Sequence, residues 1–509
     1  MRDLAVMLAD GGDCLADLRA VRDQAPLFGA VASDSTAFRV VEAIAREPGG
    51  LDRLRAAHAQ ARAQAWRFGV APEQVTIDLD ATLVTSHSDK EGAAGTFKGG
   101  FGFHPLLAYL DESGEALGAE LRPGNAGANT AADQIDVAEA ALEQIPREQI
   151  ETIELLLRVD SAGASHELLD FCREGRIGFS VGYDLTEAVR AAILDLPADC
   201  WVSALDQDGT ERRNGQVAEL TEALDLTGWP EGSRVIVRRE RPHPGAQLSF
   251  TDHDGHRFQA ILTNQTDPEL AVIERRHRAR AHVEDHIRND KDTGLANLPF
   301  RDFEHNRVWL CLVLIAHDLI AWTQTLLLAG ELARAEPKRL RYRLVHVAAR
   351  LAFSARRAKL RLSASWPWAR ELAAAFKRLR VLPGPAGCPT WRSSTTRSIT
   401  DGHRPGSRLP ARRPARGEAV EPTHRPPRGP RSPSLTRVNP PAIAPSLRGL
   451  AARSGLGYRV LVAPRDNRFG LPLTVLAVRA PRRIPALGRF FGVALPTPVR
   501  GPRRARRRR

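Results

Sequence analysis

The chain has 509 residues, of which 43% are hydrophobic, and it carries 73 Lys and Arg against 60 Asp and Glu. This length and composition predict a globular protein of about two to four domains with a sizeable core. The five cysteines lie far apart without a C-x-x-C pair, which argues against a zinc ribbon or a disulfide framework and fits a reducing cytosol.

The excess positive charge is concentrated at the C-terminal end of the chain. Residues 388–509 contain 27 Arg, no Lys and 4 acidic residues, whereas residues 1–387 contain 46 basic and 56 acidic residues. The same C-terminal segment contains 19 of the 35 prolines. Because such a sequence buries too little surface to offset its chain entropy, we predict a disordered Arg/Pro-rich tail over residues 386–509.

The sequence before this tail predicts an α/β protein. Residues 1–70 are typical of a helical N-terminal region with a turn at 46–50. After a series of strands, a helix is expected to begin near Asn129 and Thr130, whose side chains can cap it, and an apolar strand follows at 153–159. The early strands are predicted at 75–80, 103–110 and 116–121, so that the order over residues 71–199 is β-β-β-α-β-α.

The second half of the body is predicted to be helical after a β-rich segment. Residues 200–265 contain short strand candidates separated by turns and form a candidate insertion, and helices are predicted from Pro268 to about Arg380. The apolar stretch 308–330 is long enough to span a bilayer, but His317, Asp318 and Gln324 interrupt it, so we predict a buried helix. The N-terminus has no cationic leader before an apolar stretch, and we expect neither secretion nor a membrane partner.

Two aspartates lie at the end of the first predicted strand. Strand alternation puts Asp78 and Asp80 on the same face at a sheet edge, where carboxylates can hold a hard cation. The D-x-D-x-T pattern also matches the haloacid-dehalogenase phosphatases, in which Asp78 would be the nucleophile and Asp80 the acid/base. A simpler interpretation is that both side chains turn toward solvent where the strand ends.

A third aspartate, Asp160, follows the apolar strand at 153–159. The end of a buried strand lies at the carboxyl edge of an α/β sheet, where ligands bind. Asp160 also precedes a predicted helix at 161–174, so an N-cap role is the simpler interpretation of this residue taken alone.

The most specific pattern lies in a charged helix predicted over residues 275–291. Four of its residues have a characteristic spacing: His277, Arg280, Glu284 and Lys291. Separations of three, four and seven residues place them in one narrow stripe of a helix. A carboxylate between cations suits a phosphodiester site, with the carboxylate for metal and Arg or Lys for phosphate. The alternative is a solvated helix laced with salt bridges, because the neighbouring stripes are also charged.

These residues resemble the insertion-sequence transposases whose helix carries a Y-x2-R-x3-E-x6-K signature, and more closely the branch numbered thirteen-eighty. The spacing matches at all four positions, with His277 in place of the tyrosine. The resemblance covers roughly residues 1–385 and includes the stretches 77–82, 91–106, 122–125 and 158–161.

The resemblance implies an RNase-H-like mixed sheet with flanking helices and a β-rich insertion before the last catalytic helix. It implies that Asp80, Asp160 and Glu284 are the catalytic carboxylates and bind two Mg²⁺ or Mn²⁺ ions. Asp78 is an alternate metal ligand in place of Asp80.

The same resemblance implies a DNA partner. Arg280 and Lys291 would hold DNA phosphates, and His277 would contact the strand or a flipped base. The substrates would be double-stranded DNA at the transposon ends and at the target. A homodimer is expected on DNA, because two ends must be held together.

We therefore predict a DNA transposase that cleaves and transfers strands at the terminal inverted repeats of an insertion sequence, in the bacterial cytoplasm at the nucleoid. Residues 1–70 would be a truncated DNA-binding part, and residues 71–199 and 266–385 would form the catalytic core. One alternative is a phosphatase using Asp78, which requires a βαβ order directly after Thr82. Another is a catalytically inactive DNA-binding remnant.

Overall fold

In a computed structural model of the chain, residues 1–382 are described except 88, 128–129, 243–244, 247–251 and 355–356, together with residues 458–459. Helices and strands alternate, which confirms the predicted α/β class. The predicted disordered tail, residues 386–509, lies outside the described residues apart from strand β15 (Tyr458–Arg459).

The first 70 residues are helical, as predicted. The Ser33 hydroxyl accepts the backbone N–H of Thr36 at 3.4 Å and so caps one of these helices. Gly49 has a φ of 68°, a left-handed conformation that allows the turn predicted at 46–50. The helices are α1 (Arg2–Ala9), α2 (Leu18–Arg22), α3 (Ala25–Phe28), α4 (Asp34–Arg46) and α5 (Gly50–Ala65).

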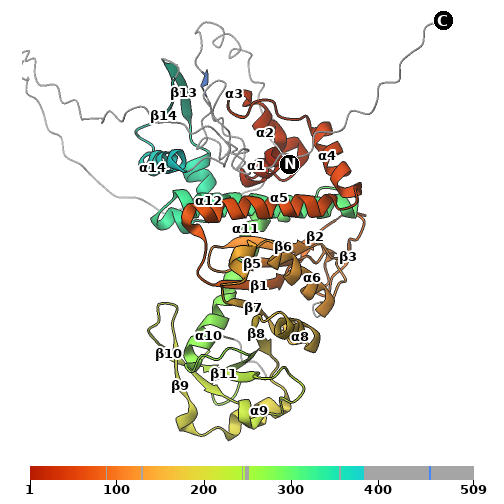
Figure 1. Ribbon diagram of the computed structural model, residues 1–509, viewed down its shortest axis with the longest axis vertical. Coiled ribbons are helices and arrows are strands. Elements are labelled where there is room, and N and C mark those ends of the chain that lie inside the picture. The colour runs from red at the N-terminus through yellow and green to blue at the C-terminus, as the bar shows by residue number, and fades with distance from the viewer. Residues whose placement is uncertain are drawn as a thin grey trace, which may run out of the picture. The chain divides into compact units, whose positions relative to one another are not determined.

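A nine-stranded mixed sheet forms the centre of the fold (Figure 1). Strand β1 pairs antiparallel with β5 on one side and parallel with β7 on the other. Strand β6 pairs antiparallel with β5, and β8 pairs parallel with β7, so the predicted meander is followed by parallel strands. This arrangement fits the predicted RNase-H-like sheet. The strands are β1 (Val75–Ala81), β5 (Leu106–Leu110), β6 (Glu115–Glu120), β7 (Leu155–Val159) and β8 (Gly178–Tyr183).

The β-rich segment predicted at 200–265 continues this same sheet. Beyond β8 the order is β12, β11, β10 and β9, all antiparallel to their neighbours. The strands are β9 (Val202–Leu205), β10 (Glu211–Glu219), β11 (Arg234–Glu240) and β12 (Arg257–Thr263).

Helices cover both faces of the central strands (Figure 1). Helices α6 (Ala131–Leu142) and α8 (His166–Glu174) pack on the face that receives Val75, Ile77 and Leu79 of β1. Helices α11 (His282–Asp290) and α12 (Phe303–Leu327) lie over the other face. Because strand side chains alternate, Asp78 and Asp80 belong to this second face.

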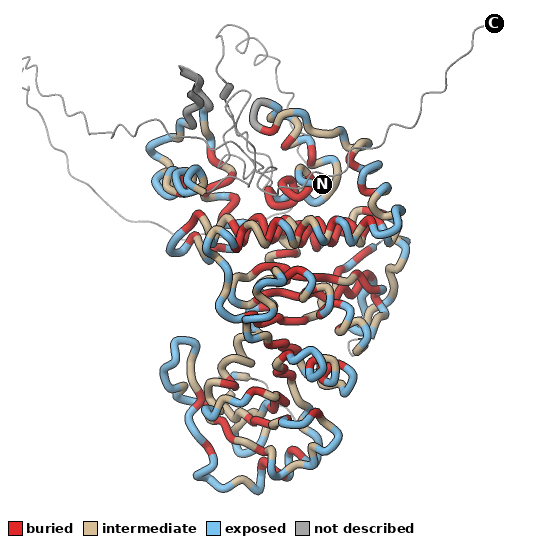
Figure 2. Tube along the Cα trace, viewed as in Figure 1, coloured by how far each residue is buried: buried red, intermediate tan, exposed pale blue. Residues whose placement is uncertain are grey.

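The apolar stretch 308–330 forms the buried helix α12, as predicted. By length and composition α12 could cross a membrane, yet 72% of its most apolar window is buried inside the fold. In Figure 2 buried residues run along α5 and α12 and through the central strands. Helix α12 packs against α1, α4, α5 and β6, so it is the central helix of the core.

Helices dominate residues 268–380, as predicted, but the segment also contains strands that were not predicted. A hairpin of β13 (Ala349–Ser354) and β14 (Arg357–Leu362) interrupts the helices. The sequence of β14 alternates charged and apolar residues with period two, whereas β13 does not, so the hairpin as a whole carried no clear strand pattern. The other elements are β2 (Val84–Thr85), β3 (Ala94–Gly95), β4 (Phe101–Phe103), α7 (Arg147–Ile150), α9 (Glu187–Asp195), α10 (Leu270–Arg278), α13 (Pro337–Leu340) and α14 (Ala369–Val381).

The predicted capping of α6 is also corrected. Thr130 is the N-cap residue, but its side chain makes no capping hydrogen bond, and Asn129 lies outside the described residues. Packing of Val137, Ala138 and Ala141 into the core holds this helix instead.

A buried ionic network joins α5 and α12 to β6. Arg62 is fully buried, its Nε lies 3.2 Å from Oε1 of Glu115, and its Nη2 donates to Asp318. Nε2 of His58 lies 2.7 Å from Oδ2 of the same aspartate. Pairing of each charge makes this burial possible, and the network fixes how the helical layer sits on the sheet.

A second buried network lies beneath α11. The hydroxyl of Tyr109 donates to Asp290 at 2.6 Å, and Nδ1 of His317 lies 2.6 Å from the other oxygen of that carboxylate. Burial lowers the pKa of His317, but the carboxylates of Asp290 and Asp318 raise it further, to about 9.

We expect this histidine to make stability depend on pH in the alkaline range. Because its folded pKa of about 9 exceeds the ordinary value of 6.5, its stabilisation is fully present below pH 6.5 and is lost as the pH rises through 9. His317→Gln should be less stable than the wild type by roughly 3 kcal/mol near neutral or lower pH. Urea unfolding of both proteins at about pH 6, 8 and 9.5 measures the difference. A difference that does not shrink with rising pH would contradict this assignment.

Candidate active site

Asp80 lies where β1 leaves the central sheet. Its side chain is 19% exposed, and Oδ1 accepts the N–H of Ala81 at 2.9 Å. Burial raises the pKa of Asp80, Arg280 opposes the increase, and the charges of Asp160 and Glu284 add to it, for a net value of about 6. The fold therefore brings Asp160 and Glu284 each within electrostatic range of Asp80.

Asp160 follows the last residue of β7, the strand beside β1. Its Oδ1 accepts the N–H of Ala162 at 3.0 Å and caps a short 3-10 turn, Ser161–Gly163. The two interpretations of this aspartate are thus compatible, because one oxygen caps the turn while the carboxylate remains at the sheet edge beside Asp80.

Gly182 of β8 fixes the position of the backbone at Asp160. A Cβ atom added to Gly182 would lie 2.6 Å from the backbone N of Ser161 and 3.0 Å from the carbonyl C of Asp160. Both are backbone atoms, so a side chain at position 182 would push the Asp160 turn away from the sheet.

We expect Gly182→Ala to lower by about tenfold to a hundredfold the DNA cleavage that the sequence resemblance implies for Asp160, because small displacements of a catalytic group are costly. Gly118→Ala in β6 is the matched control, since its Cβ would meet backbone atoms only at 3.4 Å, an ordinary contact. Cleavage rates measured well below the melting temperatures of both variants make the comparison. Equal rates for the two variants would contradict the positional role of Gly182.

Glu284 lies in the first turn of α11 and is exposed. Within the described part of the chain it makes no hydrogen bond or ion pair, so its carboxylate is available to a ligand. It contributes to the raised pKa of Asp80, which shows that the helix carries it over the end of β1.

Asp78, the alternate metal ligand, has a different environment. It is fully buried, and its two oxygens accept from Nε and Nη2 of Arg158 at 2.7 and 2.6 Å. The same Nη2 lies 2.9 Å from Asp111. Burial raises the pKa of Asp78 to about 6, although Arg158 acts against the increase. Both oxygens are occupied, so Asp78 fastens β1 to β7 and is not exposed to serve as a phosphatase nucleophile.

Arg280 contributes a cation to the site. It lies in the short turn Ala279–Ala281 that divides the predicted continuous helix into α10 and α11. Its Nη1 lies 3.8 Å from Oδ2 of Asp80 and is buried without a hydrogen-bond partner among the described residues. An N–H donor held in this state can bind a phosphate oxygen.

His277 and Lys291 flank this centre along the same helical stripe. Nδ1 of His277 lies 2.9 Å from the Ser180 hydroxyl, and burial followed by nearby arginines lowers its pKa to about 3. The imidazole is therefore neutral at physiological pH. Burial and the nearby Lys98 lower the pKa of Lys291.

Sequence reasoning missed two residues that the fold places at this site. Arg158 was visible as a charged residue in an apolar strand, which requires a buried partner, but its partner Asp78 is eighty positions away. The pairing of His282 Nδ1 with Asp111 at 2.8 Å had no sequence signal, because the two residues meet only through the packing of α11 on the sheet.

The donor set fits a hard divalent cation. Three carboxylates supply only oxygen ligands, and burial together with the charges of Asp160 and Glu284 raises the pKa of Asp80, so a bound cation would stabilise the charged form of Asp80. Among the described residues, the ligand atoms of these three do not all lie within 4.8 Å of one another.

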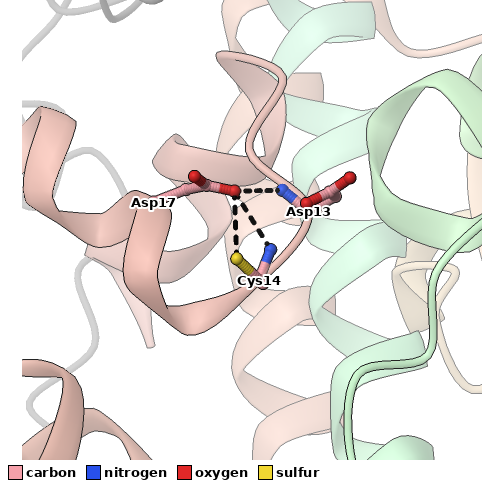
Figure 3. Close-up of side chains that lie close together, drawn as sticks. All are labelled: Asp13, Cys14 and Asp17. Carbon is pink, nitrogen blue, oxygen red and sulfur yellow. Dashed lines mark hydrogen bonds between the residues drawn. The ribbon is translucent and has the colours of Figure 1, made fainter.

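A tighter cluster elsewhere is a helix cap. Asp13, Cys14 and Asp17 lie together near the N-terminus (Figure 3). One oxygen of Asp17 accepts the N–H of Asp13 at 3.0 Å and both the N–H and the thiol of Cys14 at 3.3 Å. These hydrogen bonds account for the cluster without a metal ion.

Three carboxylates beside an arginine at one sheet edge form the class of site that metal-dependent phosphoryl transfer uses. Residues 1–384 match the family described as "Transposase DDE domain group 1". The chain belongs to this family of DDE transposases.

Among solved structures, the chain is similar to the one titled "Cryo-EM structure of piggyBac transposase synaptic complex with hairpin DNA". The identity is 7%, the TM-score is 0.31, and the match covers 53% of this chain and 52% of that chain. The chain thus spans about half the length of that solved chain. Comparison with curated proteins gives no match.

Proposed function

We propose that the chain cleaves DNA strands and transfers them to a target by divalent-metal-dependent chemistry, with Asp80, Asp160 and Glu284 as the catalytic carboxylates. The observation that carries the proposal is their convergence. Two neighbouring strand ends and one helix bring three carboxylates together in a chain that belongs to the DDE transposases.

The three carboxylates would hold two Mg²⁺ or Mn²⁺ ions between them. When bound, such ions lower the pKa of the attacking water or 3′-hydroxyl and stabilise the leaving oxygen. The protein keeps one carboxylate on each of three elements: Asp80 is held by the sheet, Asp160 by its own capped turn and Glu284 by α11.

Arg280 and Lys291 would bind phosphates on either side of the cut. The unsatisfied Nη1 of Arg280 lies close to Asp80 and so supports a contact at the scissile phosphate. Lys291 is one and a half to two helical turns beyond Glu284, which supports a contact further along the strand. His277, which is neutral, would contact the strand through its ring or its free nitrogen.

We further propose that the substrates are the terminal inverted repeats of an insertion sequence and a double-stranded target. Membership of the thirteen-eighty branch is supported by the spacing of the four signature residues, His277, Arg280, Glu284 and Lys291. The chain would act as a homodimer on DNA, at the nucleoid in the cytoplasm. Residues 1–70 would be a DNA-binding part, residues 71–199 and 266–385 the catalytic core, and residues 200–265 an insertion.

The direct test uses a duplex that carries the element's terminal inverted repeat. The full chain should nick the duplex at the repeat end with Mg²⁺ or Mn²⁺ and not with EDTA, while a duplex of scrambled sequence stays intact. Binding that depends on salt without any metal-dependent cleavage would instead identify an inactive DNA-binding remnant and overturn the proposal.

A further inference from the structure

A small hairpin protrudes from the sheet edge where Asp80 lies. After β1 the chain forms a three-stranded sheet in the order β2, β4, β3. The loop between β3 and β4 is closed by hydrogen bonds between Thr96 and Gly100, from Thr96 N–H to the Gly100 carbonyl at 2.8 Å and from Gly100 N–H to the Thr96 hydroxyl at 3.1 Å. The loop therefore has a defined shape.

Two large aromatic side chains of this hairpin face solvent. Phe97 is 68% exposed and Phe101 is 45% exposed. The ring of Phe97 lies 5.7 Å from that of His104, and Nζ of Lys98 lies 5.5 Å from its centroid. Two exposed rings on one short hairpin, with a lysine beside one of them, offer flat apolar faces on which an aromatic ligand can stack.

Lys98 lies beside the Phe97 ring and within electrostatic range of a second lysine, Lys291. Lys98 of the loop lies near enough to Lys291, at the end of α11, to help burial lower its pKa. Neither lysine forms an ion pair with an acidic residue in the described part of the chain. Two cations within electrostatic range of each other, each without an ion-paired carboxylate in the described part of the chain, favour the binding of an anion such as a phosphate.

Two of the segments that form this group lie close in sequence to proposed catalytic residues. Lys291 follows Glu284 by seven residues, which corresponds to about 10 Å along a helix. Strand β2, which pairs with β4 of the hairpin, begins four residues after Asp80. Figure 1 shows β2 and β3 at the end of the sheet next to the central strands.

We propose that Phe97, Lys98, Phe101 and Lys291, here called the hairpin patch, bind unpaired nucleotides of a DNA strand end beside the cleavage site. The two rings stack on bases, and the two lysines bind the phosphates between them. Aromatic side chains combined with cations are the general means by which proteins hold single-stranded DNA. The inference rests on the proposed function, because it assigns the hairpin patch to the DNA that the catalytic residues cut.

The test compares two DNA probes that differ only in unpaired nucleotides. One is a blunt duplex of about 30 base pairs, and the other is the same duplex with a 3′ extension of about six thymidines. Affinities are measured by fluorescence anisotropy with Ca²⁺, which prevents cleavage. We expect the wild type to prefer the extended probe, and Phe97→Ala to lose about tenfold or more in affinity for it while binding the blunt duplex as before.

Matched variants distinguish base stacking on the Phe97 ring from other effects of the substitution on binding. Phe97→Trp should retain the preference, whereas Phe97→Leu, which is apolar but cannot stack, should lose it. Lys98→Ala should lower the salt dependence of binding to the extended probe by about one unit of slope. Tyr342→Ala removes an aromatic that is 61% exposed elsewhere on the chain, and it should change nothing.

Two outcomes would overturn the inference. In the first, Phe97→Ala and Phe101→Ala bind both probes as Tyr342→Ala does. In the second, the Phe97→Ala chain changes its oligomeric state in gel filtration, which would assign the rings to a contact between copies of the chain. Cleavage of the inverted-repeat duplex by the wild type is measured in parallel, so a failure of the hairpin patch is distinguishable from a failure of the proposed function.

Discussion

Replacing Arg158 with Met is expected to lower the free energy of unfolding by about 3–5 kcal/mol, because it leaves a buried charge without its partner. Asp78 is fully buried, and both of its oxygens accept from Arg158. Asp111 lies against the same guanidinium and would be left facing another carboxylate. Urea unfolding at neutral pH measures the loss.

Two further variants sharpen this experiment. Arg173→Met removes an arginine whose ion pairs are half exposed, and it should change stability very little. Adding Asp78→Leu to Arg158→Met removes both buried charges, and it should recover part of the lost stability. If Arg158→Met were as stable as Arg173→Met, the ion pair between β1 and β7 would not have the structural role assigned to it.

Unlike Arg158→Met, Asp80→Asn is expected to lower strand cleavage without lowering the free energy of unfolding. Strand cleavage should fall by about a thousandfold or more, because a metal ligand is lost from the site. Stability at neutral pH should not fall and is expected to rise. Burial and like charges raise the pKa of Asp80 to about 6, so its charged form is disfavoured in the folded protein.

This prediction holds only if strand cleavage falls while the free energy of unfolding does not. Single-turnover cleavage of the inverted-repeat duplex gives the first, and urea unfolding at pH 7 gives the second. Asp285→Asn on α11 is the control, because Asp285 is exposed and pairs only with Arg288 of its own helix. Cleavage that is lost only together with stability would point to a structural role for Asp80.

Strand alternation was sufficient to place Asp78 and Asp80 on one face, but not to distinguish them. Their roles diverge because Arg158, in a different strand, lies beside Asp78 and leaves Asp80 free at the strand end. Parallel pairing of β1 with β7 sets Asp78 opposite Arg158 in the register, and that register depends on the whole sheet. The pattern of neighbouring residues in the sequence therefore does not predict this register.

The helical signature was predictable because its spacing is local. In the structure a short 3-10 turn at Ala279–Ala281 divides the helix that carries the four residues from His277 to Lys291. By contrast, the hairpin of β13 and β14 was not predicted, because it lies within a segment whose residues mostly favour helices. Its formation depends on pairing between strands, which composition does not reveal.

The hairpin patch had no periodic signal at all. Phe97 and Phe101 read as ordinary apolar residues of a strand region, and only the fold reveals that they face solvent. The encounter of Lys98 with Lys291 likewise joins segments almost two hundred residues apart. A binding role that depends on exposed side chains can be inferred only after the fold shows which side chains are buried.

The central claim is that three carboxylates act together on DNA through divalent ions. The most direct measurement is single-turnover cleavage of the inverted-repeat duplex with Mn²⁺ by Asp80→Asn, Asp160→Asn and Glu284→Gln, each alone and in pairs. We predict that every single variant loses about a thousandfold or more and that the pairs lose little beyond this, because residues acting as a unit are not additive. Cleavage at the wild-type rate by any one of the three would contradict the account.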